Sequence, residues 1–371
     1  MIAYILLGVS LLITVTIWMK LRVVLRLFRV APQTLDIERL ESLPAVSVCI
    51  PARDEMHAMT ACLESVLLSR YPKLEIIVLD DGSRDNTGHL IKSFAHSGVR
   101  FVEGAQLPEQ WLGKNHALKG LLKEASGELI VFADVDTHFS PDSISHMVAY
   151  MLSEGADMVS VLPRREVSMR ASAVFATYRH FWSILGHTVH APASSSSAWM
   201  VRRELMEQEF ASFETIKNDV RPDKRVASAL AARGAYRYVI SDRTFGLSYD
   251  KRLSSQYETS VRIYYPDFGL RGVVFRMIGI VLLLTSYVLV LVGLLAHDLL
   301  MAMSAFAVTI VISLLNAWYL GVLRSHGYGI ATICLPFLMI RELYLLAASV
   351  VLHRRHKVMW KGRPVTAVYE R

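Results

Sequence analysis

The chain has 371 residues and a formal net charge of +7, and 53% of its residues are hydrophobic, with a mean hydropathy of +0.35. This length allows one to three domains, and the hydropathy is high for soluble domains and indicates membrane segments. The three cysteines lack metal-ligand or disulfide spacing, which excludes a zinc module and a disulfide scaffold. Basic residues cluster beside the apolar segments, so the expected partner is an anionic lipid headgroup surface and not nucleic acid.

The N-terminal stretch, residues 1–19, is apolar and carries no charge. Four basic residues follow it: Lys20, Arg22, Arg26 and Arg29. A signal peptide would place its positive charges before the apolar stretch and a small-residue cleavage site after it. The order found here predicts an uncleaved transmembrane anchor whose C-terminal end lies in the cytoplasm. Residues 20–43 are then expected to form a basic segment along the lipid headgroups.

Three more apolar segments lie near the C-terminus, at residues 273–296, 299–323 and 330–352. The first two are long enough to span a hydrocarbon core of about 30 Å. The third contains Pro336 and the pair Arg341-Glu342, so three alternatives stay open: it crosses the membrane, it re-enters the membrane, or it lies at the interface. A further alternative is that the first apolar stretch does not cross.

Residues 251–272 are expected to lie at the interface, and residues 353–371 form a basic tail. Four full crossings would leave that tail outside, against the usual bias of basic residues toward the cytoplasm. The parity of the spans therefore stays open.

Residues 44–250 are expected to form a cytoplasmic globular domain, because short apolar runs alternate there with amphipathic stretches. The runs are residues 46–50, 74–79, 99–103, 129–133 and 158–162. The amphipathic stretches are residues 56–68, 86–94, 114–123 and 143–152. This alternation predicts an α/β fold with a mixed, mostly parallel sheet and helices on both faces. Ligands of such sheets bind at the carboxyl ends of the strands.

Polar clusters fall at these strand ends. Asp134 and Asp136 follow the fourth run, and on an extended chain they point to the same side. Two carboxylates with open positions beside them suit Mg²⁺ or Mn²⁺ bridging a diphosphate. The alternative is that one of them caps the next helix or forms an Asx turn.

Two other clusters have equally plain alternatives. Asp80 and Asp81 precede a glycine and can accept hydrogen bonds from a base or a ribose, or can simply form a strand-to-helix turn. Lys114 opens a predicted helix, where a lysine suits a phosphate, or it is merely a solvated lysine.

Four motifs occur in order on successive β-α units. They are Pro-Ala-Arg-Asp-Glu at 51–55, Asp-Asp-Gly-Ser-Arg-Asp-Asn-Thr at 80–87, Gly-Lys-x-x-Ala-Leu at 113–118 and Ala-Asp-Val-Asp at 133–136. Together they resemble the inverting family 2 glycosyltransferases of the GT-A fold, over roughly residues 46–239. Residues 106–118 are most similar to membrane-bound bacterial members that glycosylate carotenoid acids of the 4,4'-diaponeurosporenoate type or act near hopanoid pathways.

The Trp-Lys-Gly-Arg sequence at 360–363 also recurs in such membrane enzymes, although an interfacial tryptophan among basic residues explains it as well. The resemblance further implies which residues bind the sugar donor. These are Pro51, Arg53, Glu55, Asp80, Asp81, Lys114 and Asp134, and the metal ligands are Asp134 and Asp136.

The catalytic base of the family is the aspartate of a Glu-Asp pair in the second half of the domain. Residues 215–230 match that region best, with Asp219 as the base. An asparagine replaces the glutamate, and a proline interrupts the usual helix, so Asp223 and Glu214 remain alternatives.

The resemblance thus implies an enzyme, a multi-pass membrane hexosyltransferase that moves one sugar from a nucleotide-diphosphate sugar to a lipid or isoprenoid-type acceptor. A UDP-sugar is the expected donor, and Mg²⁺ or Mn²⁺ the expected cofactor. The Gln-x-x-Arg-Trp motif of processive synthases is absent from the sequence. A processive polysaccharide synthase and a catalytically degenerate nucleotide-binding membrane scaffold are the two alternatives.

Overall fold

The computed structural model describes residues 1–28, 43–165, 171–323 and 328–365, and the chain divides into two compact units. The helical unit comprises Met1–Leu27, Arg165–Leu185 and Lys251–Val358. The sheet unit comprises Phe28–Arg164, Gly186–Asp250 and Met359–Arg371. This division differs from the predicted domain at 44–250, because Arg165–Leu185 belong to the helical unit and the C-terminal residues belong to the sheet unit.

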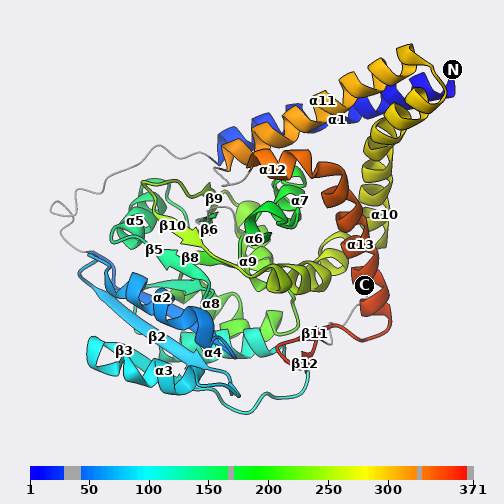
Figure 1. Ribbon diagram of the computed structural model, residues 1–371. Helices are drawn as coiled ribbons and strands as arrows, with labels where there is room; N and C mark the ends of the chain where they lie inside the picture. The colour runs from blue at the N-terminus through cyan, green and yellow to red at the C-terminus, as the bar shows by residue number, and fades with distance from the viewer. Residues whose placement is uncertain (29–42, 166–170, 324–327, 366–371) are drawn as a thin grey trace. The chain divides into compact units, whose positions relative to one another are not determined.

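Seven strands form the main sheet, in the order β3-β2-β1-β4-β8-β6-β9 (Figure 1). They are β1 Val46–Ala52, β2 Leu74–Asp80, β3 Val99–Glu103, β4 Leu129–Ala133, β6 Met158–Leu162, β8 Ala198–Arg202 and β9 Tyr236–Ile240. Strand β8 is antiparallel to its neighbours β4 and β6. The other pairs are parallel, which confirms the predicted mixed, mostly parallel sheet.

The register of the sheet sets where the polar clusters lie. Ala52 at the end of β1 pairs with Asp80 at the end of β2, and Asp80 pairs with Glu103 at the end of β3. The loops that follow these parallel strands therefore leave the sheet at one edge. The central strands β1 and β4 are buried and mostly apolar, as is typical of strands covered on both faces.

Helices cover both faces of this sheet, as predicted. Val48 and Ile50 of β1 share a core with Met59 of α2. Cys49, between them, faces the other way, and its Sγ lies 4.0 Å from the carbonyl oxygen of Leu121 in α4. The helices of the sheet unit are α2 Met56–Leu67, α3 Thr87–Ser93, α4 Gly113–Glu124, α5 Ser143–Ser153, α8 Arg203–Gln208 and α9 Pro222–Ala231.

Short elements complete this unit. A smaller sheet contains β5 Thr137–Phe139, β10 Leu247–Tyr249 and β7 Arg164–Arg165, and the 3-10 helices are η2 Ala95–Ser97 and η3 Ala211–Ile216. A C-terminal hairpin pairs β11 Met359–Trp360 with β12 Arg363–Pro364.

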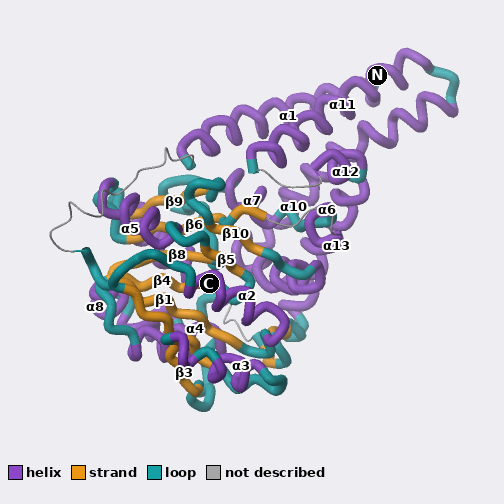
Figure 2. Tube along the Cα trace, turned by 60° about the vertical axis from the view of Figure 1, so that its left-hand side comes forward, coloured by secondary structure: helices purple, strands orange, loops and turns teal. Residues whose placement is uncertain are grey.

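Within the described residues, four helices are long and apolar enough to cross a membrane: α1 Ile2–Leu27, α10 Leu253–Leu295, α11 Leu299–Val322 and α13 Leu335–Arg354. Helix α1 lies alongside α11 in Figures 1 and 2, and its Ser10 hydroxyl donates to the carbonyl oxygen of Leu282 in α10 (2.6 Å). Shorter helices are α6 Ala171–Val174, α7 Arg179–Leu185 and α12 Tyr328–Ile333.

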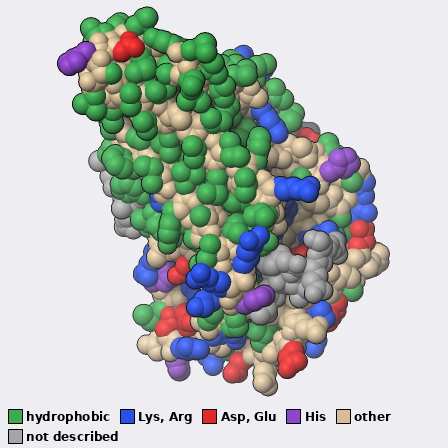
Figure 3. Space-filling view, turned by 90° about the vertical axis from the view of Figure 1, so that its right-hand side faces the viewer, with side chains coloured by type: hydrophobic (Ala, Val, Ile, Leu, Met, Phe, Trp, Pro, Cys, Tyr) green, Lys and Arg blue, Asp and Glu red, His purple; other side chains and the backbone are tan. Residues whose placement is uncertain are grey.

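The surface of these helices is strongly apolar. Figure 3 shows hydrophobic side chains spread over one face of them. Exposed residues include Phe275, Leu291 and Leu295 of α10 and Met303 and Phe306 of α11. Such a surface is unusual for a protein in water and is suited to contact with lipid chains. The helical unit therefore contains the helices that are suited to a membrane.

The helix ends differ from the segments predicted for them. Helix α1 continues unbroken to Leu27, so the first part of the predicted 20–43 segment extends the anchor helix, and residues 29–42 lie outside the described residues. Helix α10 includes most of the predicted interfacial segment at 251–272 and bends at Gly269 (φ 62°), three residues after Pro266. The third apolar segment is broken between α12 and α13, next to Pro336.

A buried carboxylate joins elements of the helical unit. Glu342 of α13 is 1% exposed. It accepts hydrogen bonds from the indole Nε1 of Trp182 (2.9 Å), the hydroxyl of Tyr264 (2.5 Å) and the backbone N–H of Tyr178 (3.4 Å). These bonds satisfy the carboxylate and connect α13 with α7 and α10.

Candidate active site

The loop after β2 carries two aspartates with different roles. Asp80 Oδ1 accepts the backbone N–H of Ser83 (3.1 Å), so its side chain stabilises its own loop. The turn also needs Gly82, whose φ of 67° strains any side chain. Asp81 instead donates its backbone N–H to the carbonyl oxygen of Ala52 (2.8 Å), which ties this loop to the end of β1.

Asp81 is bound by two arginines from distant parts of the chain. Its Oδ2 accepts a hydrogen bond from Nη1 of Arg363 (2.6 Å). Its carbonyl oxygen accepts one from Nη1 of Arg53, which also donates to the carbonyl oxygen of Gly82 (3.0 Å). Burial raises the pKa of Asp81 above its usual value, although Arg363 and Arg53 act in the opposite direction.

The C-terminal hairpin contacts the loop after β1 as well. Arg53 Nε donates to the carbonyl oxygen of Lys361 (3.1 Å). The Lys361 ammonium in turn contacts the carboxylate of Glu55 (2.8 Å) and the carbonyl oxygen of Asp54 (3.1 Å). Arg53 and Glu55, two residues predicted to bind the sugar donor, therefore both contact the hairpin.

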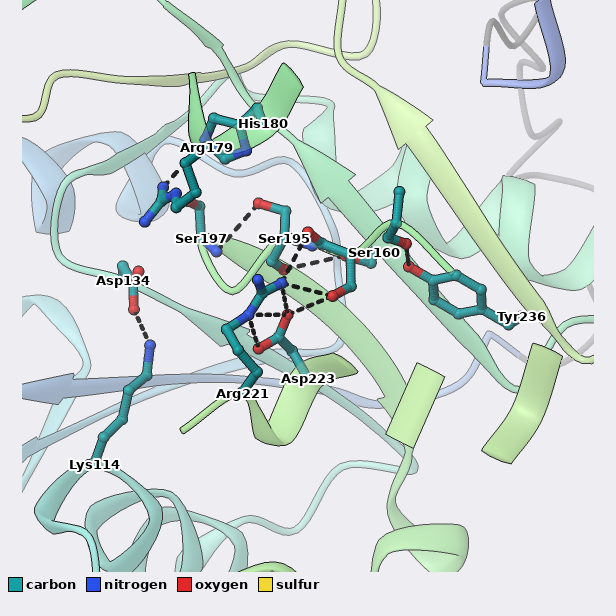
Figure 4. A network of polar contacts seen from close by, with 12 residues as sticks. Lys114, Asp134, Ser160, Arg179, His180, Ser195, Ser197, Arg221, Asp223 and Tyr236 are labelled. Carbon is teal, nitrogen blue, oxygen red and sulfur yellow. Dashed lines mark hydrogen bonds and ion pairs between the residues drawn. The ribbon is translucent and has the colours of Figure 1, made fainter. Parts of the chain in front are cut away.

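Lys114 joins this region to the end of β4. Helix α4 begins at Gly113, and the Lys114 ammonium contacts Asp134 Oδ1 at 2.5 Å (Figure 4). A Cβ atom added to Gly113 would lie 3.3 Å from Asp81 Oδ2, so the start of α4 lies directly beside Asp81. The structure thus brings Arg53, Asp81, Lys114 and Asp134 into one connected group.

Asp134 and Asp136 follow β4 on a fixed backbone. Asp134 N–H donates to the carbonyl oxygen of Ser197 (2.9 Å), and the carbonyl oxygen of Asp136 accepts the N–H of Asp250 (3.1 Å). Burial raises the pKa of the Cys62 thiol, and the charges of Asp136, Asp134 and Glu55 raise it further. The three carboxylates therefore all lie within electrostatic reach of one sulfur atom.

These carboxylates fit a hard divalent cation. Asp134 already holds a cation, the ammonium of Lys114. Within the part of the chain that the structure describes, no group of three His, Cys, Asp or Glu side chains forms a metal cage. Mg²⁺ is commonly held by one or two carboxylates with substrate phosphates and water at the other positions. Asp134 and Asp136 can hold such an ion in that manner.

The three acids considered for the base lie in different surroundings. Asp219 follows a turn whose carbonyl groups accept from Asn115 of α4, and its carboxylate is 43% exposed and 3.8 Å from Arg225. Glu214 forms an ion pair with Lys119, and this contact lowers the pKa of Glu214.

Asp223 is buried at the start of α9 (Figure 4). It accepts hydrogen bonds from Arg221 Nη2 (2.7 Å) and from the hydroxyl of Ser194 (2.8 Å). Burial alone would raise its pKa, but the charge and hydrogen bonds of Arg221, the Ser194 hydroxyl and the charge of Lys114 hold that pKa below its usual value. Asp223 therefore lies within electrostatic reach of the Lys114 ammonium.

Sequence reasoning overlooked three of these contacts. It assigned no partner to Asp81, Glu55 or Asp223, whose partners are Arg363, Lys361 and Arg221. Only the hairpin could have been predicted from a local pattern, because a glycine at the second position of a short turn, as in Lys361-Gly362, is typical of a two-residue hairpin turn.

Comparisons with known proteins show which family and which fold this chain resembles. Residues 47–209 match the model of the family described as glycosyl transferase family 2. The probable glycosyltransferase YdaM of Bacillus subtilis is 31% identical over 121 residues, which are 32% of this chain and 29% of that protein. A 4,4'-diaponeurosporenoate glycosyltransferase of Staphylococcus aureus is 28% identical over 147 residues, 39% of this chain and 38% of that protein. The matched part thus spans about a third of the length of these curated relatives.

The mannosyltransferase PcManGT from Pyrobaculum calidifontis, solved in complex with GDP-Man and Mn²⁺, shares the fold with a TM-score of 0.56. The two proteins are 18% identical, and the likeness covers 95% of this chain and 97% of that one. Residues 47–209 are therefore similar to the family 2 glycosyltransferases, and the chain shares its fold with that mannosyltransferase.

Proposed function

We propose that this protein is a membrane-bound inverting glycosyltransferase that moves one sugar from a nucleotide-diphosphate sugar to a lipid-like acceptor. A UDP-sugar is the proposed donor. The observation that carries this proposal is the connected group at the strand ends, in which Arg53, Asp81, Lys114 and Asp134 come from four successive β-α units. The whole-protein activity and its substrates are proposals, because the curated relatives match only in part.

Three residues of this group, Asp81, Lys114 and Asp134, have a proposed role. Asp81 can accept hydrogen bonds from the base or ribose of the donor. Asp134 and Asp136 would hold Mg²⁺ or Mn²⁺, which would neutralise the diphosphate of the leaving nucleotide. Lys114 stands at the N-terminus of α4, where its charge and the helix dipole both favour a phosphate.

The transfer needs a base on the face of the sugar opposite the nucleotide. The acceptor oxygen forms a bond to the anomeric carbon, the bond from that carbon to the diphosphate breaks, and the base takes the hydroxyl proton. We propose Asp219 as this base, because its carboxylate is accessible to an acceptor. Asp223 is the second candidate, because its charge is coupled to Lys114.

The four long apolar helices of the same chain support a lipid-like acceptor. One relative is named for a carotenoid acid, diaponeurosporenoate, which is an apolar acceptor. We propose that the sheet unit lies on the cytoplasmic side, since basic residues follow the apolar stretch at 1–19 and basic residues are enriched on the cytoplasmic side of membrane segments.

The test is a transfer assay with the full chain in lipid nanodiscs, Mn²⁺, and UDP-glucose, UDP-GlcNAc or GDP-mannose as donor. Released nucleotide diphosphate and the mass of the extracted lipids are measured. One added sugar per lipid is the expected product, and chelation of the metal should stop its formation. A long polymer would contradict single-sugar transfer, and donor binding without any transfer would favour a scaffold.

A further inference from the structure

The C-terminal hairpin, Met359–Pro364, supplies charges to the donor region. Among the described residues there, three lysine or arginine side chains form ion pairs with carboxylates to which the family resemblance gives a role in binding the sugar donor: Arg363–Asp81, Lys361–Glu55 and Lys114–Asp134. Two of the three cations come from the hairpin. The side chains are largely shielded from water, with Arg363 24% and Asp81 5% exposed.

The hairpin is built to hold these side chains in place. Trp360 pairs with Arg363 across a two-residue turn in which Lys361 and Gly362 have φ of 48° and 75°. Positive φ at both positions is the mark of a type I′ turn, which Gly favours and which matches the twist of the strands. The turn is also fixed from outside, because Arg53 donates to the carbonyl oxygen of Lys361.

The position of the Arg363 guanidinium points to a phosphate. A Cβ atom on Gly113 would lie 2.9 Å from Arg363 Nη1, so the guanidinium reaches the first residue of α4. Lys114, the proposed phosphate contact, is the next residue. Arg363, Lys114 and the N-terminus of α4 thus form one positive region, and such a region suits an anion.

We propose that Arg363 is a donor-binding residue that contacts Asp81 when no donor is bound and contacts the diphosphate of the nucleotide sugar when the donor is bound. This inference rests on the proposed function. The bound nucleotide sugar would offer N–H or O–H groups to the Asp81 carboxylate and phosphate oxygens to the Arg363 guanidinium. Asp81 and Arg363 would then each exchange the other for a group of the nucleotide sugar. A planar guanidinium can donate two parallel hydrogen bonds to a phosphate, which a lysine cannot.

The test uses the full chain in nanodiscs and isothermal titration with UDP and GDP in the presence of Mn²⁺. The nucleotide that binds the wild type is then compared with its monophosphate. In Arg363→Gln, affinity for the diphosphate should fall about 10- to 100-fold, as for the loss of hydrogen bonds to a charged group. Affinity for the monophosphate should fall clearly less. Arg363→Lys keeps the charge, and its affinity for the diphosphate should fall by a factor between those of the wild type and Arg363→Gln. This variant replaces Arg363→Gln in the test if the glutamine variant does not fold.

Arg202→Gln is the matched control, because Arg202 forms an exposed ion pair with Asp157 (2.9 Å). It should bind the diphosphate like the wild type. Equal losses for diphosphate and monophosphate in Arg363→Gln would overturn the proposal, because Arg363 would then only position Asp81. Unchanged or tighter binding would also overturn it, the latter by showing that the hairpin blocks the site. A wild type that binds neither UDP nor GDP would refute the proposed function itself, and the role of Arg363 with it.

Discussion

The guanidinium of Arg221 donates from Nε to Oδ1 of Asp223 (3.1 Å) and from Nη2 to Oδ2 (2.7 Å), across the single residue Pro222. Both side chains are shielded, at 9% and 1% exposure. Arg221 Nη2 also donates to the carbonyl oxygen of Ser194 (3.0 Å). This pair fixes the start of α9 against the segment that leads into β8.

Loss of Arg221 should destabilise the protein, because the Asp223 charge would stay buried without its main partner. We expect Arg221→Met to lower the free energy of unfolding by about 3–5 kcal/mol, the usual effect of breaking a buried pair. Arg202→Met, at the exposed pair with Asp157, should cost at most about 1 kcal/mol. Thermal unfolding of both variants measures this, and equal shifts would show that burial of the Arg221 pair has no special effect.

Replacement of Asp136, a proposed metal ligand, should weaken binding of the nucleotide only through the metal. We expect Asp136→Asn to lower the Mn²⁺-dependent gain in affinity for a nucleotide diphosphate by about tenfold or more, since neutral amides are poorer ligands of hard cations. Titration with and without Mn²⁺ measures the gain. Asp157→Asn, at an exposed carboxylate paired with Arg202, is the control. A full Mn²⁺ effect in the Asp136 variant would refute the metal assignment.

The base can be identified by comparing two amide variants. Asp219→Asn should reduce kcat about 100-fold or more, as expected for loss of a general base, with donor binding unchanged. Glu214→Gln should keep most of its activity, because Glu214 pairs with Lys119. If Asp223→Asn instead loses turnover while it remains folded and binds donor, the role belongs to Asp223.

Alanine substitutions at two glycines, Gly113 and Gly127, form a matched pair. An alanine at Gly113 would place its Cβ 2.9 Å from Nη1 of Arg363, the movable end of a side chain. We therefore expect Gly113→Ala to weaken nucleotide diphosphate binding severalfold with little effect on stability. At Gly127 the Cβ would meet the backbone nitrogen of Ser47 at 2.7 Å. Gly127→Ala should lower stability by about 1–3 kcal/mol. Normal nucleotide affinity in Gly113→Ala would contradict the close contact with Arg363.

The Glu75 carboxylate should make the stability of the fold depend on pH in the acidic range. Burial alone would raise its pKa, but hydrogen bonds from Ser47, Ser126 and Gly127 hold the pKa of Glu75 below its usual value of 4.5. The unfolded state therefore takes up a proton first, so this stabilisation is present above pH 4.5 and is lost as the pH falls through the lower folded pKa. Glu75→Gln should unfold at lower temperature at pH 7 and lose less of its stability between pH 5 and about pH 3. If the unfolding temperatures of the variant and the wild type fall in parallel between pH 5 and about pH 3, Glu75 does not have this role.

The central β-α units could be predicted because their periodicity is strong. The strands at 99–103, 129–133 and 158–162 appear with the predicted bounds, and the helix predicted at 143–152 is one residue longer. Strand β8 was not predicted, because an antiparallel strand inserted between β4 and β6 follows from tertiary pairing and not from its local pattern.

The candidate site could be predicted only in part. Local motifs indicated Asp81, Lys114 and Asp134, since each follows or precedes a regular element. Their partners could not be predicted, because sequence spacing carries no information about a contact such as that of Asp81 with Arg363, 282 residues later.

That separation has a consequence for biosynthesis. Three of the four long hydrophobic helices, α10, α11 and α13, lie between Asp81 and Arg363 in the sequence. The ribosome therefore completes these helices while the sheet unit still lacks its last strand pair, β11 and β12. A nascent chain released early, even after the whole of α13, would be missing the guanidinium beside Asp81. The long apolar helices must therefore be synthesised before the sheet unit is complete.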